Sequence, residues 1–77
     1  MADHISITVD GEIVALPRGE HDTIYVLTAS GLTAPWKYDL IRLDQDGRHV
    51  VTHQARDTVV LADGDDFITA PISTTAA

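Results

Sequence analysis

The 77-residue sequence contains no cysteine, which excludes disulfide bonds, cysteine-ligated zinc and catalysis by a thiol. Aromatic residues make up only 5% of the chain, so the core must be built mainly from isoleucine, valine and leucine. No stretch approaches the about 20 apolar residues that a membrane-spanning helix needs, and no secretory signal is visible at the start. These absences indicate a small protein of a reducing compartment, and we expect a cytoplasmic one.

Basic residues are also scarce. Five lysines and arginines stand against twelve aspartates and glutamates, which gives a formal net charge of −7. Proteins bind a phosphate backbone through clustered cations, so the charge argues against a nucleic-acid partner. A basic protein surface is a better match, because opposite charge speeds the encounter. The alternative is that the charge only keeps the protein soluble.

The N-terminal segment has the pattern of a β-hairpin. Residues His4–Val9 alternate between polar and apolar side chains with a period of two, as in a strand with one buried face. Asp10-Gly11 follows and favours a two-residue turn. Residues 12–16 form the predicted return strand, which Pro17 ends. The side chains expected on one common face are Ile5, Ile7, Val9, Val14 and Leu16.

A loop over 18–21 and a short helix are predicted next. Asp22 or Thr23 offers an N-cap oxygen, and Ser30-Gly31 offers a stop signal. The buried stripe of this helix is expected to contain Ile24, Leu27 and Thr28, with Tyr25 or Val26 nearby.

The second half alternates apolar segments with turns. Strands are predicted over Tyr38–Leu43 and 67–70, and a shorter one over 48–51. Residues 52–58 have no regular pattern, and 59–61 are a short apolar run. The order strand, strand, helix, strand, strand, strand allows the third strand to pair in parallel with the first, with the last strand between or beside them.

This order predicts an α+β fold of the β-grasp type, a mixed four- to five-stranded sheet with one helix on one face. The predicted domain covers 1–70, and 71–77 form a C-terminal tail. The sheet face away from the helix has no second layer in so short a chain.

Adjacent apolar residues in three strands indicate what that second face presents. A strand buries only one residue of each such pair. If Val14, Leu40 and Phe67 are core residues, the residues left outside are Ile13, Ile41 and Ile68. Together they predict an apolar, partner-binding patch. The alternative is a set of scattered apolar side chains.

No catalytic, metal or cofactor site is expected. His49 and His53 are four residues apart, but the valines between them favour a strand, and no acid completes a site. Asp63, Asp65 and Asp66 lack the further ligands of a calcium loop and are better explained as a turn. The serines have no neighbouring base and orienting group in the sequence.

Four segments together resemble bacterial ubiquitin-like proteins, and more narrowly the multiubiquitin-type β-grasp domains of operons that also encode ubiquitin-activating, conjugating and deubiquitinase-like enzymes. The segments are Ile-Ser-Ile-Thr-Val-Asp-Gly-Glu from Ile5, Asp-Thr-Ile from Asp22, Tyr-Asp-Leu-Ile-Arg-Leu from Tyr38, and Leu-Ala-Asp-Gly-Asp-Asp-Phe-Ile from Leu61. The resemblance runs from Ile5 to about Ala70.

The resemblance implies a ubiquitin-like β-grasp modifier that is a monomer when free. An adenylating enzyme would activate its C-terminal carboxylate for conjugation to an acceptor protein. The conjugation tail would be Thr74, Thr75, Ala76 and Ala77. The implied partners are an activating enzyme, a conjugating enzyme and a deubiquitinase-like peptidase.

The tail departs from the Gly-Gly ending of ubiquitin, since the chain ends in Thr-Thr-Ala-Ala. This departure argues against a sulfur carrier. A non-covalent β-grasp adaptor remains the alternative function.

Overall fold

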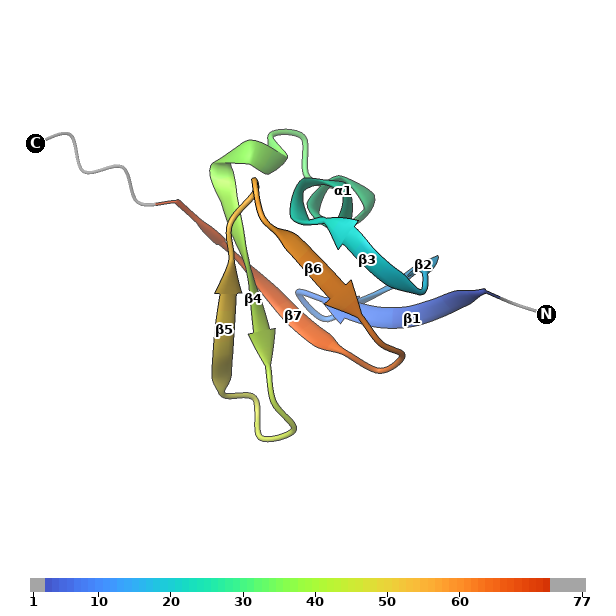
Figure 1. Cartoon of the computed structure of the whole chain (residues 1–77). Helices are drawn as coiled ribbons and strands as arrows, with labels where there is room; N and C mark the ends of the chain where they lie inside the picture. Colours follow the sequence, from blue (N-terminus) through green and yellow to red (C-terminus); the bar gives the residue numbers. More distant parts are fainter. Residues whose placement is uncertain (1–2, 73–77) are drawn as a thin grey trace, which may run out of the picture.

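A computed structural model describes residues 3–72 of the chain (Figure 1). Its elements are β1 His4–Val9, β2 Glu12–Pro17, β3 Gly19–Asp22, α1 Thr23–Ala29, the 3₁₀ helix η1 Pro35–Lys37, β4 Tyr38–Leu43, β5 His49–His53, β6 Thr58–Leu61 and β7 Asp66–Pro71. Five strands form a sheet in the order β2-β1-β7-β4-β5, and β3 pairs with β6 in a separate ladder. The fold is α+β, with a mixed five-stranded sheet and one α-helix, consistent with a β-grasp-like arrangement.

The predicted N-terminal hairpin is confirmed. Strands β1 and β2 pair antiparallel along their whole length, from His4 opposite Pro17 to Val9 opposite Glu12. The turn residues Asp10 and Gly11 have φ angles of 53° and 82°, the left-handed values that a type I′ turn requires. The predicted face of this hairpin is turned inward, because four of its five apolar side chains are buried and the fifth, Val14, packs against the core.

Strand β7 lies between β1 and β4, which is one of the two places expected for the last strand, but the expected parallel pairing of β4 with β1 is wrong. The parallel partner of β1 is β7, in the register Thr8 with Asp66 and Val9 with Phe67, whereas β4 runs antiparallel to β7. The turn before β7 explains the placement, because it bonds to the backbone of β1. Gly64 N donates to Ser6 O at 2.8 Å, and Thr8 N donates to the carbonyl of the residue before Asp66 at 2.9 Å. The last strand is thereby directed into the gap between β1 and β4.

The predicted loop over 18–21 is wrong, because most of it belongs to β3. This strand is polar and short, and it pairs antiparallel with β6, from Gly19 opposite Leu61 to Asp22 opposite Thr58. Strand β6 supplies the apolar side chains that β3 lacks, since Val59 and Leu61 are both buried. Strand β5 also runs two residues beyond its predicted end, to His53.

The helix is confirmed, but its buried side is partly different from the prediction. Asp22 occupies the N-cap position in an extended conformation, without a side-chain hydrogen bond to the helix. The buried residues are Thr23, Val26 and Leu27. Thr28 is exposed instead, and its hydroxyl donates to Ile24 O at 2.7 Å. The helix has three buried positions in seven residues, so its stability must come from packing rather than from length.

One core lies between the five-stranded sheet and a second layer made by α1 and β6 (Figure 1). Its buried members are Ile5, Ile7, Val9, Leu16, Val26, Leu27, Leu40, Val59, Leu61 and Phe67. Strand β1 contributes three alternate residues to this core and β7 contributes Phe67, so the residues next to them in these strands point to the opposite face.

Candidate partner-binding surface

The open face of the sheet carries an apolar pair at its centre. Ile41 on β4 lies directly opposite Ile68 on β7, and both alternate with the buried core residues Leu40 and Phe67. Directly opposite side chains on one sheet face lie in contact range of each other. Ile68 is 38% exposed and Ile41 is half-buried, so part of the pair remains accessible.

Ile13 lies on the same face but apart from this pair. It is opposite Thr8 on β1, and Thr8 is in turn opposite Asp66 on β7. Ile68 is two residues farther along β7, on the same side as Asp66. Ile13 is 79% exposed. The three predicted residues thus share a face, but Thr8 and Asp66 separate Ile13 from the other two.

The open face is acidic. Asp39 and Asp66 alternate with the buried residues of β4 and β7, and they flank the apolar pair along the strands. In the strands of the five-stranded sheet the one lysine or arginine is Arg42, which lies over the ring of the buried Phe67 and so faces the core side. The described face therefore combines apolar and negatively charged groups, which suits a partner surface with apolar and basic side chains.

Asp10 fixes the hairpin turn against this surface. Its carboxylate accepts hydrogen bonds from Thr69 N at 2.8 Å and Thr69 Oγ1 at 2.6 Å, while its own N–H donates to Phe67 O at 3.0 Å. The turn is thus held beside the residue that follows Ile68. Its carboxylate serves the fold, because both oxygens already have partners within the chain.

A second surface, which the sequence did not indicate, surrounds Trp36 at the end of β7. The indole is 59% exposed and borders a hollow of about 480 Å³ that Lys37, Tyr38, Pro71 and Ile72 also line. Ile72 N donates to Lys37 O at 2.8 Å, so the folded part of the chain continues one residue past β7. The available signal was a tryptophan between Pro35 and a lysine, in a segment interpreted only as a loop.

The predicted conjugation tail lies outside the described residues. Thr74, Thr75, Ala76 and Ala77 follow Ile72, which is the last residue that the structure describes.

Metal binding finds no support in the part of the chain from 3 to 72. No group of three or more histidine, aspartate or glutamate side chains there is arranged to hold an ion. His49 and His53 are opposite Leu43 and Leu40, on different faces of β5. Asp63 accepts from Ser6 N at 2.8 Å, as expected for an aspartate that holds a turn.

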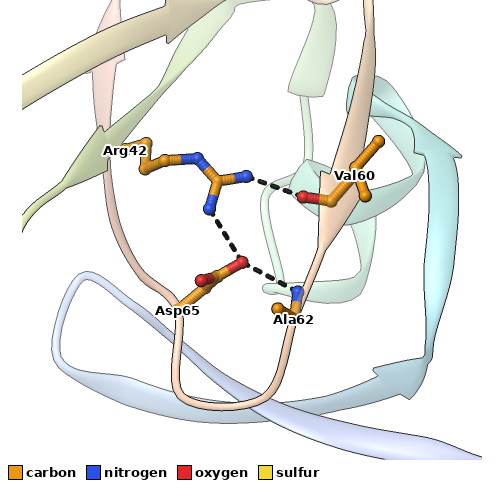
Figure 2. Close-up of polar contacts among 4 residues, drawn as sticks. All are labelled: Arg42, Val60, Ala62 and Asp65. Carbon is orange, nitrogen blue, oxygen red and sulfur yellow. Dashed lines mark hydrogen bonds and ion pairs between the residues drawn. The ribbon is translucent and has the colours of Figure 1, made fainter.

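On the core side, Arg42 links the five-stranded sheet to the β3–β6 pair (Figure 2). Its guanidinium donates to Val60 O on β6 at 2.7 Å and pairs with the Asp65 carboxylate at 2.8 Å. The same carboxylate accepts from Ala62 N at 2.8 Å. The cation also lies 4.8 Å from the centre of the Phe67 ring. One side chain on β4 therefore holds β6 and the turn that precedes β7.

His53 lies on the same side of the sheet, opposite Leu40. Burial, and secondarily the positive charge of Arg42, lower the pKa of His53 from its usual 6.5, against the opposite effect of Asp57. Its Nε2 atom is buried and has no hydrogen-bond partner among the described residues. The protonated form of the ring is therefore disfavoured at this position.

Comparison with known proteins gives no match to a protein-family model, to a curated protein or to a solved structure. No helix within residues 3–72 is long and apolar enough to cross a membrane.

Proposed function

We propose that this chain is a ubiquitin-like β-grasp protein modifier. The observation that carries the proposal is the central position of β7, parallel to β1 and antiparallel to β4. A strand paired on both sides anchors the point from which the C-terminal segment leaves the fold. An enzyme that works on that segment then acts on a chain whose origin is firmly held.

In the proposed reaction, the C-terminal carboxylate, on Ala77 or on a nearby tail residue, attacks the α-phosphorus of ATP on a ubiquitin-activating-type enzyme. Pyrophosphate leaves, and an acyl adenylate forms. A nucleophile of the acceptor then attacks the carbonyl carbon, loses its proton and displaces AMP. A conjugating-type enzyme and a deubiquitinase-like peptidase would complete a cytoplasmic pathway. The modifier supplies the carboxylate and the gripping surface, and the enzyme supplies the catalysis.

The open face of the sheet is the proposed binding surface for the enzyme. The Ile41–Ile68 pair offers apolar contact, and Asp39 and Asp66 offer charge that attracts a basic enzyme surface. Ile13 would take part at the margin, because it is exposed but separated from the pair.

The test is to incubate the protein with ATP and a candidate adenylating enzyme encoded beside its gene, and to measure intact masses. We expect release of pyrophosphate and a covalent adduct. Ile68→Ser should weaken the reaction, whereas Val60→Ser, which changes an exposed valine on β6, should not. If neither the whole chain nor chains trimmed within the tail form an adduct, the proposal fails.

The second candidate is a non-covalent adaptor. The acidic, apolar open face favours it equally, because such a face binds a partner without any reaction at the tail. Deleting residues 73–77 separates the two functions, since an adaptor keeps its partner and a modifier loses its substrate group.

A further inference from the structure

Within residues 3–72, several strand edges have no strand partner, and side chains of the same chain block one of them. On β6, the Arg42 guanidinium donates a hydrogen bond to the carbonyl of Val60, and the Asp65 carboxylate accepts one from the N–H of Ala62 just beyond the strand (Figure 2). Exposed edges are templates for pairing with another chain unless something blocks them. The Arg42–Asp65 pair is such a block.

Two further edge strands carry other protective features. Strand β2 ends in Pro17, which has no N–H to donate, and His21 Nε2 lies 2.7 Å from the Pro17 carbonyl oxygen. Strand β3 carries the exposed acids Glu20 and Asp22 within its four residues. Charge and proline on an edge are the usual defences against a second strand.

Strand β5 has none of these features. Its five residues, His49–His53, include no proline, lysine, arginine or acid, and within residues 3–72 no side chain bonds to their backbone. Val50 is 56% exposed and Val51 is 40% exposed. A bulge disturbs only the start of the strand, because the register shift lies between Arg42 and Leu43 of β4. Beyond it, Val51 to His53 form a regular ladder with a free outer edge.

We propose that β5 pairs antiparallel with β5 of a second copy of this chain, joining two five-stranded sheets into one. An edge pairing of this kind is self-complementary about a twofold axis. With the axis at Val51, that valine lies beside its counterpart, and His49 lies opposite His53 of the other copy. This differs from the monomer expected from the sequence alone, and it does not depend on the proposed modifier function.

Charge at the two ends of β5 favours a second copy as the occupant. The turn before β5 holds Asp44, Asp46 and Arg48, and the turn after it holds Arg56 and Asp57, so each turn carries both signs. Antiparallel pairing places the turn after one strand next to the turn before the other. In the register given above, Asp46 of one copy is opposite Arg56 of the other, Arg48 lies in the turn that meets Asp57, and both contacts are repeated by symmetry. The net charge of −7 on each copy opposes association, so we expect a weak dimer.

The first test is sedimentation equilibrium from low micromolar to about 1 mM protein, the range in which a small interface dissociates. We expect a monomer–dimer equilibrium that Val51→Lys weakens at least tenfold. Val60→Lys is the matched control, because it adds the same charge at an exposed valine on the blocked edge. A monomer at all concentrations overturns the proposal. Equal loss with both lysine variants, or loss with Ile68→Lys but not with Val51→Lys, also overturns it.

The second test does not depend on the stability of a lysine variant. The chain has no cysteine, so Val51→Cys introduces a single thiol. With a mild thiol oxidant at concentrations that favour the dimer, two thiols at the axis lose two protons and two electrons and form one disulfide. We expect rapid cross-linking of Val51→Cys and slow cross-linking of Val60→Cys. Equal rates for the two variants would contradict the proposed pairing.

Discussion

Strands β5 and β6 differ mainly in what lies along their free edges. Both are short, both contain a Val-Val pair, and neither contains a charged residue. Strand β6 has its edge closed by a cation from β4 and an acid from the following turn, whereas β5 has no such partner among residues 3–72. Because these two strands are alike in composition, the comparison indicates that side chains from elsewhere in the chain can decide whether a strand edge is available.

The difference also extends to the core. In β6, Val59 and Leu61 are buried and cover the sheet together with α1. In β5, both valines are exposed, and His53, opposite the buried Leu40, is the one half-buried residue. Strand β6 is thus part of the second layer of the fold, whereas β5 is an edge strand that contributes no residue to the buried core.

Removal of Arg42 should have the largest effect on stability. Arg42→Ala removes the ion pair with Asp65, the hydrogen bond to Val60 O and the contact with the Phe67 ring. We expect the free energy of unfolding to fall by about 2–3 kcal/mol. Arg48→Ala, at an exposed position in the turn before β5, should change it by less than about 0.5 kcal/mol. Chemical denaturation of both variants decides this, and equal effects would contradict the role given to Arg42.

A pair of valine truncations should show the next largest contrast. Val59 is 1% exposed and Val51 is 40% exposed. Val59→Ala deletes buried carbon and leaves a cavity, so we expect a loss of about 2 kcal/mol. Val51→Ala at low protein concentration should lose less than half of that. If thermal or chemical unfolding gives equal losses, β6 does not belong to the core as described.

The pairing of the strands was only partly predictable from the sequence. The hairpin of β1 and β2 was predicted because β1 alternates between polar and apolar side chains and Asp10-Gly11 favours the turn. Strand β3 was missed because Gly19–Asp22 has no apolar pattern of its own and pairs with a strand far along the chain. The sequence left open whether the last strand lies between the first and third strands or beside them, because the choice depends on bonds from the turn before β7 to Ser6 and Thr8.

The candidate partner-binding surface was also only partly predictable, because the sequence does not give the register between strands. Alternation places Ile41 and Ile68 on the open face, but only the register of β4 and β7 makes them direct neighbours. Ile13 lies two strands from Ile68, because β1 lies between β2 and β7. Arg42 stands at a core-facing position of β4, in line with Tyr38 and Leu40, and a periodic pattern gives no sign of a partner such as Asp65.

A smaller effect on the free energy of unfolding is expected from Asp65, the acid beside the edge of β6. Asp65→Asn keeps an acceptor for Ala62 N but removes the charge that pairs with Arg42. We expect a loss of about 1 kcal/mol, because the pair is only partly exposed. A double-mutant cycle with Arg42→Ala should give a coupling of at least 0.5 kcal/mol, in the range found for residues in contact. Purely additive losses would show that the two side chains do not act together.

The smallest effect should appear in the pH dependence. Because the folded state lowers the pKa of His53, the unfolded state takes up the proton more readily as the pH falls. The stability from a neutral His53 is therefore full above its usual 6.5 and is lost as the pH falls through the lower, folded value. His53→Gln should remove this part of the acid dependence, and His49→Gln on the same strand should keep it. Urea denaturation across pH 5–8 measures the free energy of unfolding of both variants. If it falls by the same amount at low pH in both, the pH dependence does not come from His53.

Amide hydrogen exchange, resolved by residue with NMR, tests the contrast between the two edges most directly. It is measured on the same protein at about 20 µM and about 1 mM, on either side of the expected dimer transition. The amide of Ala62 should be protected at both concentrations, because Asp65 holds it within the chain. The outward amides of β5 should exchange rapidly in the dilute sample and slow down in the concentrated one. Rapid exchange at Ala62, or outward β5 amides that ignore concentration, would contradict the account.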